Sequence, residues 1–94
     1  MSTRPEVTDE ADRHRYVARV DGVQAGLIAY MLSPGGIRLV HTEVADAYEG
    51  RGIAGTLARY ALDDARTRGL SVHPDCPFVK AWIDRHPDYA DLVA

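Results

Sequence analysis

The sequence predicts one small α/β domain (α+β in some schemes), in which an antiparallel β-meander is followed by a helix, a strand and a second helix. The first observation is Asp21-Gly22 between two β-forming runs, because a type I′ hairpin turn needs positive φ twice. The second is an apolar repeat of three to four residues after position 52, typical of an amphipathic helix. The third is the length of 94 residues, which suits one domain with a modest core.

Three β-strands are expected in the first half of the chain. Residues 1–12 are polar and show no period, so we interpret them as a flexible N-terminal lead-in to a single domain spanning 13–94. Strands are expected at residues 15–20 and 23–32, on either side of the hairpin turn, and at 37–44. Under strict alternation the last strand has one face with Ile37, Leu39, His41 and Glu43, and another with Arg38, Val40, Thr42 and Val44.

The second half of the chain is expected to continue with a helix, a strand and another helix. The apolar stripe predicts a helix from Ile53 that ends at Gly69, a suitable residue for a helix C-terminus. A short apolar run at residues 70–72 is interpreted as a fourth strand. Pro77 suits the first turn of a second helix, and Pro87 ends that helix before a final helical turn. This order predicts a mixed sheet with helices packed on it.

Composition and charge exclude several classes of protein. The net charge is −3 and the pI is about 5.7, with no basic stripe, which argues against nucleic-acid binding. No apolar run approaches the ~20 residues of a membrane span, and the N-terminus has no apolar signal segment. We therefore expect a cytoplasmic protein with no membrane partner. One cysteine and four histidines show no metal-ligand spacing, so no metal site is expected.

Three glycines, Gly50, Gly52 and Gly55, stand where the first helix begins. Glycine is unfavourable inside helices, whereas a helix N-terminus binds anions and bare backbone lets a phosphate approach closely. One interpretation is a dinucleotide site, because the glycines match G-x-G-x-x-G and Asp75 follows about 20 residues later. That motif belongs to a parallel βαβ unit, which an antiparallel meander does not provide. An ordinary strand-to-helix turn is a further explanation.

Another interpretation rests on a family resemblance. Glu49-x-x-Gly52-x-Ala54 resembles the acetyl-CoA pyrophosphate loop of the GNAT (GCN5-related N-acetyltransferase) family, Gln/Arg-x-x-Gly-x-Gly/Ala, which follows a central strand and opens a long helix. The segments HTEV, GRGIA, LDDAR, CPF and RHPDYADLV follow in the same order. From about residue 16 to 93, the chain resembles minimal single-domain GNAT-like proteins. The visible departure is Glu49, where the family has glutamine or arginine.

The resemblance implies a minimal GNAT-like fold that binds acetyl-CoA. The main chain at the end of the third strand, Thr42 to Val44, would pair with the pantetheine arm. A backbone N–H near Val44 would polarise the thioester carbonyl. The pyrophosphate would be held by the backbone N–H groups of Arg51, Gly52, Ile53, Ala54 and Gly55.

Cys76, Glu43 and His41 are the candidate catalytic residues. Cys76 precedes Pro77 at the start of the second helix, where the helix dipole favours a thiolate, and the resemblance places the cysteine of CPF near the thioester. Against this, Asp75 disfavours a second negative charge, and a free cysteine is commonly buried filler. Glu43, with His41 on the same strand, would deprotonate the incoming amine if it faces the cleft. Otherwise both side chains are ordinary solvated or half-buried groups.

The sequence therefore predicts an acetyl-CoA-dependent acetyltransferase that acts on an amine of an unknown acceptor, which is a small molecule or a protein. Direct transfer in a ternary complex and an acetyl-cysteine route through Cys76 both stay open. A non-catalytic module that binds CoA or senses acetyl-CoA is the alternative, and a protein-interaction domain without a cofactor is a third possibility. We expect a monomer or a weak homodimer formed through an exposed sheet edge.

Overall fold

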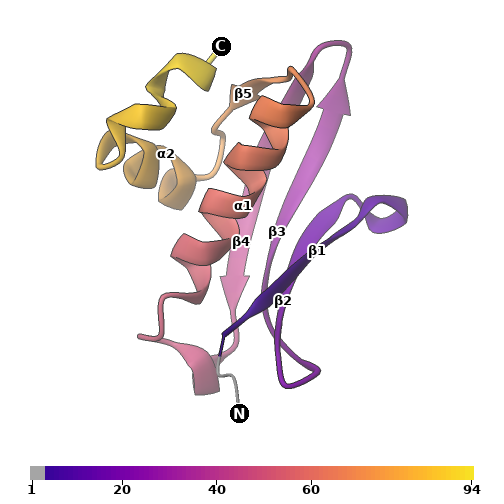
Figure 1. Ribbon diagram of the computed structural model, residues 1–94, viewed down its shortest axis with the longest axis vertical. Coiled ribbons are helices and arrows are strands. Elements are labelled where there is room, and N and C mark those ends of the chain that lie inside the picture. Colours follow the sequence, from indigo (N-terminus) through magenta and orange to yellow (C-terminus); the bar gives the residue numbers. More distant parts are fainter. Residues whose placement is uncertain (1–3) are drawn as a thin grey trace.

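A computed structural model describes residues 4–94 and shows a five-stranded sheet with helices packed on it (Figure 1). The strands lie side by side in chain order and span Glu6–Glu10 (β1), Arg15–Val20 (β2), Val23–Ser33 (β3), Gly36–Val44 (β4) and Ser71–His73 (β5). The α-helices span Ile53–Thr67 (α1) and Pro77–Asp84 (α2). Short 3-10 helices span Ala11–Arg13, Asp46–Tyr48 and Pro87–Leu92.

The sheet is mixed, which confirms the predicted α/β (α+β) fold class. β1 to β4 form an antiparallel meander, whereas β5 pairs with β4 in parallel. The turn between β2 and β3 has positive φ at both Asp21 (50°) and Gly22 (80°). This is the type I′ geometry that the Asp-Gly pair predicts, and its twist matches that of the two flanking strands.

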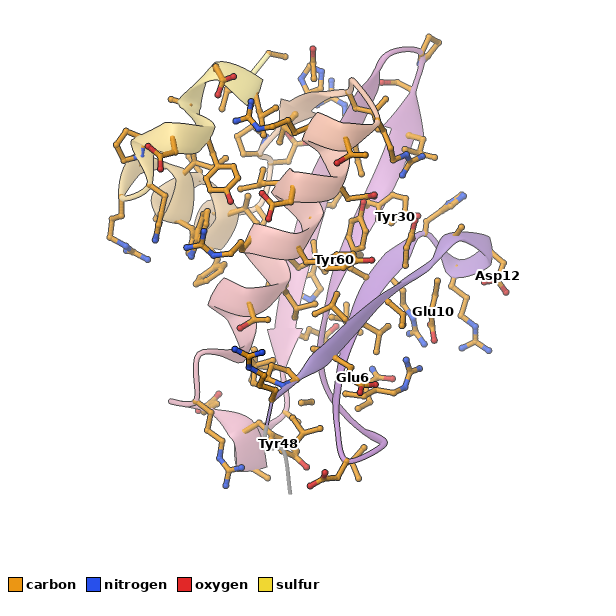
Figure 2. The ribbon with its side chains drawn as sticks, in the orientation of Figure 1. Glu6, Glu10, Asp12, Tyr30, Tyr48 and Tyr60 are labelled. Atoms are coloured by element: carbon orange, nitrogen blue, oxygen red, sulfur yellow. The ribbon has the colours of Figure 1, made fainter. Side chains whose placement is uncertain are left out.

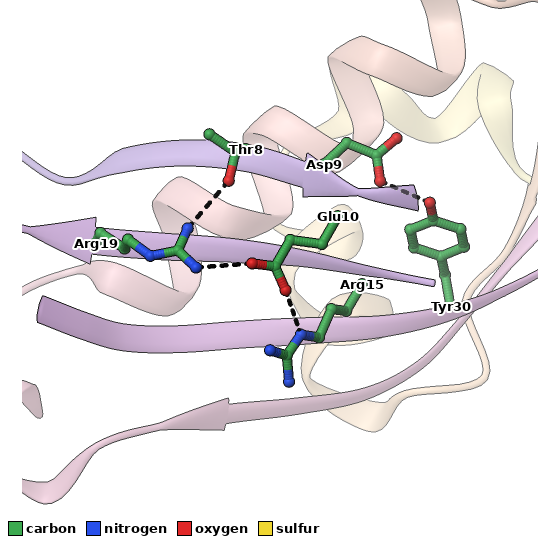
Figure 3. A network of polar contacts seen from close by, with 6 residues as sticks. All are labelled: Thr8, Asp9, Glu10, Arg15, Arg19 and Tyr30. Carbon is green, nitrogen blue, oxygen red and sulfur yellow. Dashed lines mark hydrogen bonds and ion pairs between the residues drawn. The ribbon is translucent and has the colours of Figure 1, made fainter. Parts of the chain in front are cut away.

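The polar stretch before β2 corrects one expectation, because residues 6–10 of it form β1 and not an irregular lead-in. The carboxylate of Glu10 accepts hydrogen bonds from Arg15 and Arg19 of β2, each at 2.7 Å (Figure 3). On the other face, Asp9 accepts a hydrogen bond of 2.6 Å from the hydroxyl of Tyr30. β1 is therefore held by its backbone pairing with β2 and by hydrogen bonds of polar side chains. Because these side chains are polar, the segment shows no apolar period in the sequence. The first three residues of the expected lead-in lie outside the described residues.

A β-bulge interrupts β4 at its centre. Tyr30 of β3 lies opposite Leu39, but its neighbour Ala29 lies opposite His41. Val40 is therefore the extra residue of the bulge. An extra residue shifts the alternation of the strand by one position, so the side chains beyond it exchange faces.

The exchange of faces overturns part of the predicted pattern. Leu39 is buried on the helix side of the sheet, whereas His41 and Glu43 are exposed and pair with each other. Their predicted grouping on one face with Leu39 is therefore wrong. Val44, which was expected on the other face, packs against the same core as Leu39. The bulge thus places the final residues of β4 in positions that strict alternation does not predict.

One hydrophobic core joins the inner face of the sheet to both helices. In Figure 1, α1 runs along the sheet and α2 lies beside it. Each fully buried leucine or isoleucine contributes roughly 1.5–3 kcal/mol, so the apolar stripe fixes α1 firmly on the strands. The buried residues of α1 are Ile53, Leu57, Ala58, Ala61, Leu62 and Ala65. Those of α2 are Val79, Trp82 and Ile83.

Candidate functional site

β4 and β5 pair only along their first residues and then separate. The parallel register joins Gly36–Arg38 to Ser71–His73. One further bond follows, in which the backbone N–H of Cys76 donates to the carbonyl of Leu39 at 2.8 Å. Beyond this bond, residues 40–44 have β3 on one edge and no neighbouring strand on the other, within the part of the chain that the structure describes. An open strand edge of this kind can pair with an extended ligand through its main chain.

Cys76 lies where the two strands separate. It precedes the first turn of α2 with φ −75° and ψ 124°, the extended conformation expected before Pro77. Its side chain is 5% exposed, and its Sγ lies 3.3 Å from Oγ1 of Thr42. The bulge in β4 makes this contact possible, because it turns Thr42 toward the helices. The structure thus brings together the predicted thiol and one of the predicted pantetheine-binding residues.

The glycine turn leads directly into the N-terminus of α1. Gly50 and Gly52 have φ of 79° and 75°, a backbone conformation that is costly for residues with a Cβ. The N–H of Thr56 donates to the carbonyl of Gly52 at 3.0 Å. The earlier N–H groups, from Ile53 to Gly55, precede the first helical bond and have no acceptor within the helix. No side chain caps this end, so these donors and the positive end of the helix dipole are available to an anion.

A cavity of about 580 Å³ lies between this helix start and α2. Its walls are the end of β4, the glycine turn with the first residues of α1, and one side of α2. The two helices pack closely at Gly55, where a Cβ would lie at van der Waals contact, 3.4 Å from Nε1 of Trp82. The residues from α2 and its C-terminus that line the cavity are Phe78, Trp82, Arg85 and His86.

Two charged side chains of opposite sign line this cavity. Glu49 is exposed at the glycine turn, and Arg85 is exposed at the end of α2. The guanidinium of Arg85 makes no hydrogen bond or ion pair with any residue that the structure describes. The side chain of Arg51 lies elsewhere, with its Cζ 5.3 Å from the ring centroid of Tyr48, and it lines a different cavity. Only the backbone of Arg51 therefore belongs to the turn beside Glu49.

His41 and Glu43 lie on the other face of β4 from Thr42 and Cys76. Nε2 of His41 is 3.0 Å from Oε2 of Glu43, and both side chains are more than half exposed. The structure therefore brings this pair together but does not bring it to the thiol. Asp75 is also directed elsewhere, because its carboxylate pairs with Arg38 at 3.1 Å.

Sequence reasoning missed the contribution of α2 to the cavity. Phe78 and Trp82 have the helical spacing of core residues, and Trp82 is indeed buried in the core at 5% exposure. Both residues also form part of the cavity wall, together with Arg85 and His86. A signal was present, because positions 78, 82, 85 and 86 recur at the spacing of one helix face. Its functional meaning depends on α1 lying opposite that face, which local periodicity does not predict.

The mixed sheet, the helix start after a glycine turn and the open edge of β4 define an acetyltransferase-like α/β domain. The family model described as GCN5-related N-acetyl-transferase matches residues 15–92, and the chain belongs to this family. The resemblance inferred from the glycine turn and the later segments is thereby confirmed.

Curated relatives and solved structures agree with this assignment. The chain is 33% identical over 84 residues to Protein NATD1 of Gallus gallus, covering 87% of this chain and 76% of the relative. It is 31% identical to Protein NATD1 of Danio rerio, covering 99% and 88%. A GCN5-like putative N-acetyltransferase from Staphylococcus aureus has the same fold, with a TM-score of 0.75 at 22% identity, covering 100% and 91%. The ribosomal-protein-S18-alanine N-acetyltransferase of Escherichia coli aligns with a TM-score of 0.66 at 14% identity, covering 82% and 54%.

Residues 4–94 contain no cluster of three or more histidine, cysteine, aspartate or glutamate side chains arranged to hold a metal ion. Neither α-helix in this part of the chain has the length and apolar character needed to cross a membrane.

Proposed function

We propose that this protein binds acetyl-CoA and transfers its acetyl group to an amine. The observation that carries the proposal is the alignment of three features along one path. These are the unpaired N–H groups at the start of α1, the open edge of β4, and the buried thiol of Cys76 where β4 and β5 separate. A pyrophosphate, an extended pantetheine arm and a thioester follow one another in the same order along acetyl-CoA.

The pyrophosphate belongs at the glycine turn in this proposal. The N–H groups of Ile53, Ala54 and Gly55 point out of the helix end, and the residues lie in the cavity wall. Gly50 and Gly52 keep side chains away from these donors, because neither residue has a Cβ. The turn and the dipole of α1 together stabilise a doubly charged anion.

The pantetheine arm belongs along the open edge of β4, and the thioester near Thr42 and Cys76. In direct transfer, the amine nitrogen attacks the acetyl carbonyl carbon, the carbon–sulfur bond breaks, and CoA leaves as a thiolate that takes up a proton. In the covalent route, the sulfur of Cys76 attacks the acetyl carbonyl carbon, the carbon–sulfur bond to CoA breaks, and the thiol proton passes to the departing CoA sulfur. The amine then attacks the acetyl-cysteine, and its proton returns to the cysteine sulfur as that bond breaks. Both routes conserve the acetyl group and release one CoA.

The acceptor amine belongs on the other face of β4, and we assign the acceptance of its proton to Glu43. Its carboxylate is exposed and hydrogen-bonded to His41 at 3.0 Å. The strand alone separates this carboxylate from Thr42 on the cofactor side. A carboxylate suits this role, because it both attracts a protonated amine and accepts a proton from it.

Calorimetric titration with acetyl-CoA, CoA and NAD tests the binding step, and turnover with a panel of amines tests the transfer. We expect acetyl-CoA to bind in the micromolar range, NAD not to bind, and CoA to be released with at least one amine. Binding without turnover would make the protein a sensor of acetyl-CoA. Absence of acetyl-CoA binding would exclude the acetyltransferase assignment for this chain and leave the glycines as a structural turn.

A further inference from the structure

α2 forms one wall of the cavity, and this wall carries side chains that the proposed contacts to the pyrophosphate and the pantetheine arm leave without a role. Arg85 lines the cavity across from the N-terminus of α1, and its guanidinium has no partner among the described residues. The cavity thus contains two separate groups that attract anions: the helix N-terminus and this arginine. A ligand with a single phosphate cluster would need only one of them.

The same wall carries an aromatic pair. The rings of Trp82 and His86 are stacked, with centroids 3.7 Å apart and planes 11° from parallel. Nδ1 of His86 donates to the carbonyl of Trp82 at 2.7 Å, which fixes the imidazole in this orientation. Arg59 approaches Trp82 from another direction, with its Cζ 5.3 Å from the ring centroid. Trp82 is itself buried at 5% exposure, so the half-buried imidazole of His86 is the part of this pair that can stack against a heteroaromatic ring.

We infer that Arg85 binds the phosphate on the ribose of CoA, and that the wall of Trp82 and His86 accommodates the adenine. CoA carries this 3′-phosphate apart from its pyrophosphate, so it matches a cavity with two anion-attracting groups. A guanidinium is well suited to a phosphate, because it donates several hydrogen bonds in a fixed plane. This inference rests on the proposed function, since it names the part of acetyl-CoA that the second group recognises.

A structural role for Arg85 makes a different prediction. Arg85 follows the last residue of α2, and a cation there also stabilises the helix dipole. Loss of that role would lower the stability of α2 and weaken every ligand of the cavity by the same factor. Recognition of the 3′-phosphate would weaken only ligands that carry this phosphate.

The test compares acetyl-CoA with acetyl-3′-dephospho-CoA by calorimetric titration of the full chain. We expect the wild type to bind acetyl-CoA about tenfold more tightly, the size of one charge-assisted hydrogen bond. In Arg85→Gln this ratio is expected to fall close to one, and Arg85→Lys is expected to restore part of it. Arg13→Gln is the matched control, because Arg13 is an exposed arginine in Ala11–Arg13. Its neighbour Asp12 lies on the side of the molecule away from α2 (Figure 2).

The outcomes separate this inference from the proposed function. A wild-type ratio near one, or an equal loss of both ligands in Arg85→Gln, would overturn the role of Arg85 and leave acetyl-CoA binding intact. A thermal unfolding curve of Arg85→Gln shows whether an equal loss of affinity for both ligands comes from a lower stability of the protein. Failure of the wild type to bind either ligand would overturn the proposed function, and the inference with it.

Discussion

At the scale of single residues, the contact between Cys76 and Thr42 is the feature closest to the proposed chemistry. The thiol is almost fully buried and its hydrogen-bonding neighbour is one hydroxyl at 3.3 Å. A thiol that only fills space needs no such neighbour. The contact places a polar group beside the thiol, as the proposed role of Cys76 requires, and substitutions that change the chemistry and the size of the side chain separately can test that role.

Cys76→Ala and Cys76→Ser are expected to lower the rate of acetyl transfer while leaving acetyl-CoA affinity within about threefold, because the proposed site has the thiol beside the transferred acetyl group and away from the nucleotide. Cys76→Ala should cost about 1 kcal/mol of the free energy of unfolding, the usual size for a small core truncation. Intact-protein mass spectrometry after mixing with acetyl-CoA distinguishes the two routes. An acetyl adduct on the wild type that both variants lack supports the covalent route, and no adduct supports direct transfer. Wild-type rates in both variants would remove Cys76 from the mechanism.

A substitution of Glu43 tests the reaction of the acceptor amine independently of acetyl-CoA binding. Its side chain lies on the opposite face of β4 from Thr42 and Cys76, so Glu43→Gln should leave acetyl-CoA affinity unchanged. The loss of its negative charge and proton acceptor is expected to lower kcat/KM for the amine at least tenfold. Glu6→Gln is a suitable control, since Glu6 is an exposed glutamate of β1, which β2 and β3 separate from β4. An equal fall of kcat/KM in the two variants would show that the net charge of the protein, and not the position of Glu43, controls the rate.

Glu49 is the residue that departs from the family pattern, and the structure places it in the cavity wall. A carboxylate near a pyrophosphate raises the free energy of the complex, at an exposed site by about 1 kcal/mol or less. Glu49→Gln is therefore expected to tighten acetyl-CoA binding by up to about fivefold, and the gain should shrink as salt is added. Asp12→Asn changes the net charge equally at a distant site and is expected to have no such effect. Unchanged affinity in Glu49→Gln would mean that this carboxylate is too far from the bound phosphates to affect them.

At the scale of elements, the two ends of α1 provide a matched pair of glycines. Gly52 and Gly69 have φ of 75° and 68°, and a Cβ would meet no atom within 4 Å at either position. Alanine at each should cost about 1 kcal/mol of stability, because the left-handed conformation disfavours a Cβ. Only Gly52→Ala places that Cβ beside the unpaired N–H groups, so only this variant should lose acetyl-CoA affinity, by about tenfold. Calorimetry and thermal unfolding of both variants provide the comparison, and equal losses of affinity would show a general effect of stability.

The elements also show how far a sequence alone can predict this site. The hairpin turn, the helix boundaries and the glycine turn follow from local chemistry, and the structure confirms them. β1 escaped prediction because polar side chains hold it, namely Arg15 and Arg19 of β2 and the hydroxyl of Tyr30, and these contacts leave no apolar alternation in the sequence. The bulge at Val40 escaped for a similar reason, since alternation gives a pattern but not the residue at which it shifts. That single shift decides that Thr42 contacts Cys76 and that Glu43 does not.

At the scale of the whole molecule, three tyrosine–aspartate hydrogen bonds join segments that are distant in sequence, and two of them end on α1. The hydroxyl of Tyr16 in β2 donates to Asp64 of α1 at 2.7 Å. Tyr89, in the C-terminal 3-10 helix, donates to Asp63 of α1 at the same distance. A third bond joins Tyr30 of β3 to β1. Because each of these bonds needs the tyrosine proton, they make the packing of sheet and helices sensitive to alkaline pH.

Burial first, and then the hydrogen bond to a carboxylate, raises the pKa of Tyr16 and of Tyr30 above the ordinary value of 10.0. Above about pH 10 the unfolded chain therefore loses tyrosine protons that the folded protein keeps. Because the unfolded state then binds fewer protons, the free energy of unfolding decreases as pH rises. The stabilisation is complete below pH 10 and is lost progressively above it. We expect urea unfolding between pH 8 and 11 to show this decline.

Tyr16→Phe should reduce the steepness of this decline, because one of the titrating hydroxyl groups is absent, although its stability at pH 8 should fall by about 1 kcal/mol with the loss of a buried hydrogen bond. Tyr48→Phe is the control, since Tyr48 makes no hydroxyl hydrogen bond with the described residues and lies in the 3-10 helix Asp46–Tyr48 that precedes α1 (Figure 2). It is expected to keep the wild-type slope. A Tyr16→Phe protein that loses stability above pH 10 as steeply as the wild type would show that other groups control the alkaline limit of this fold.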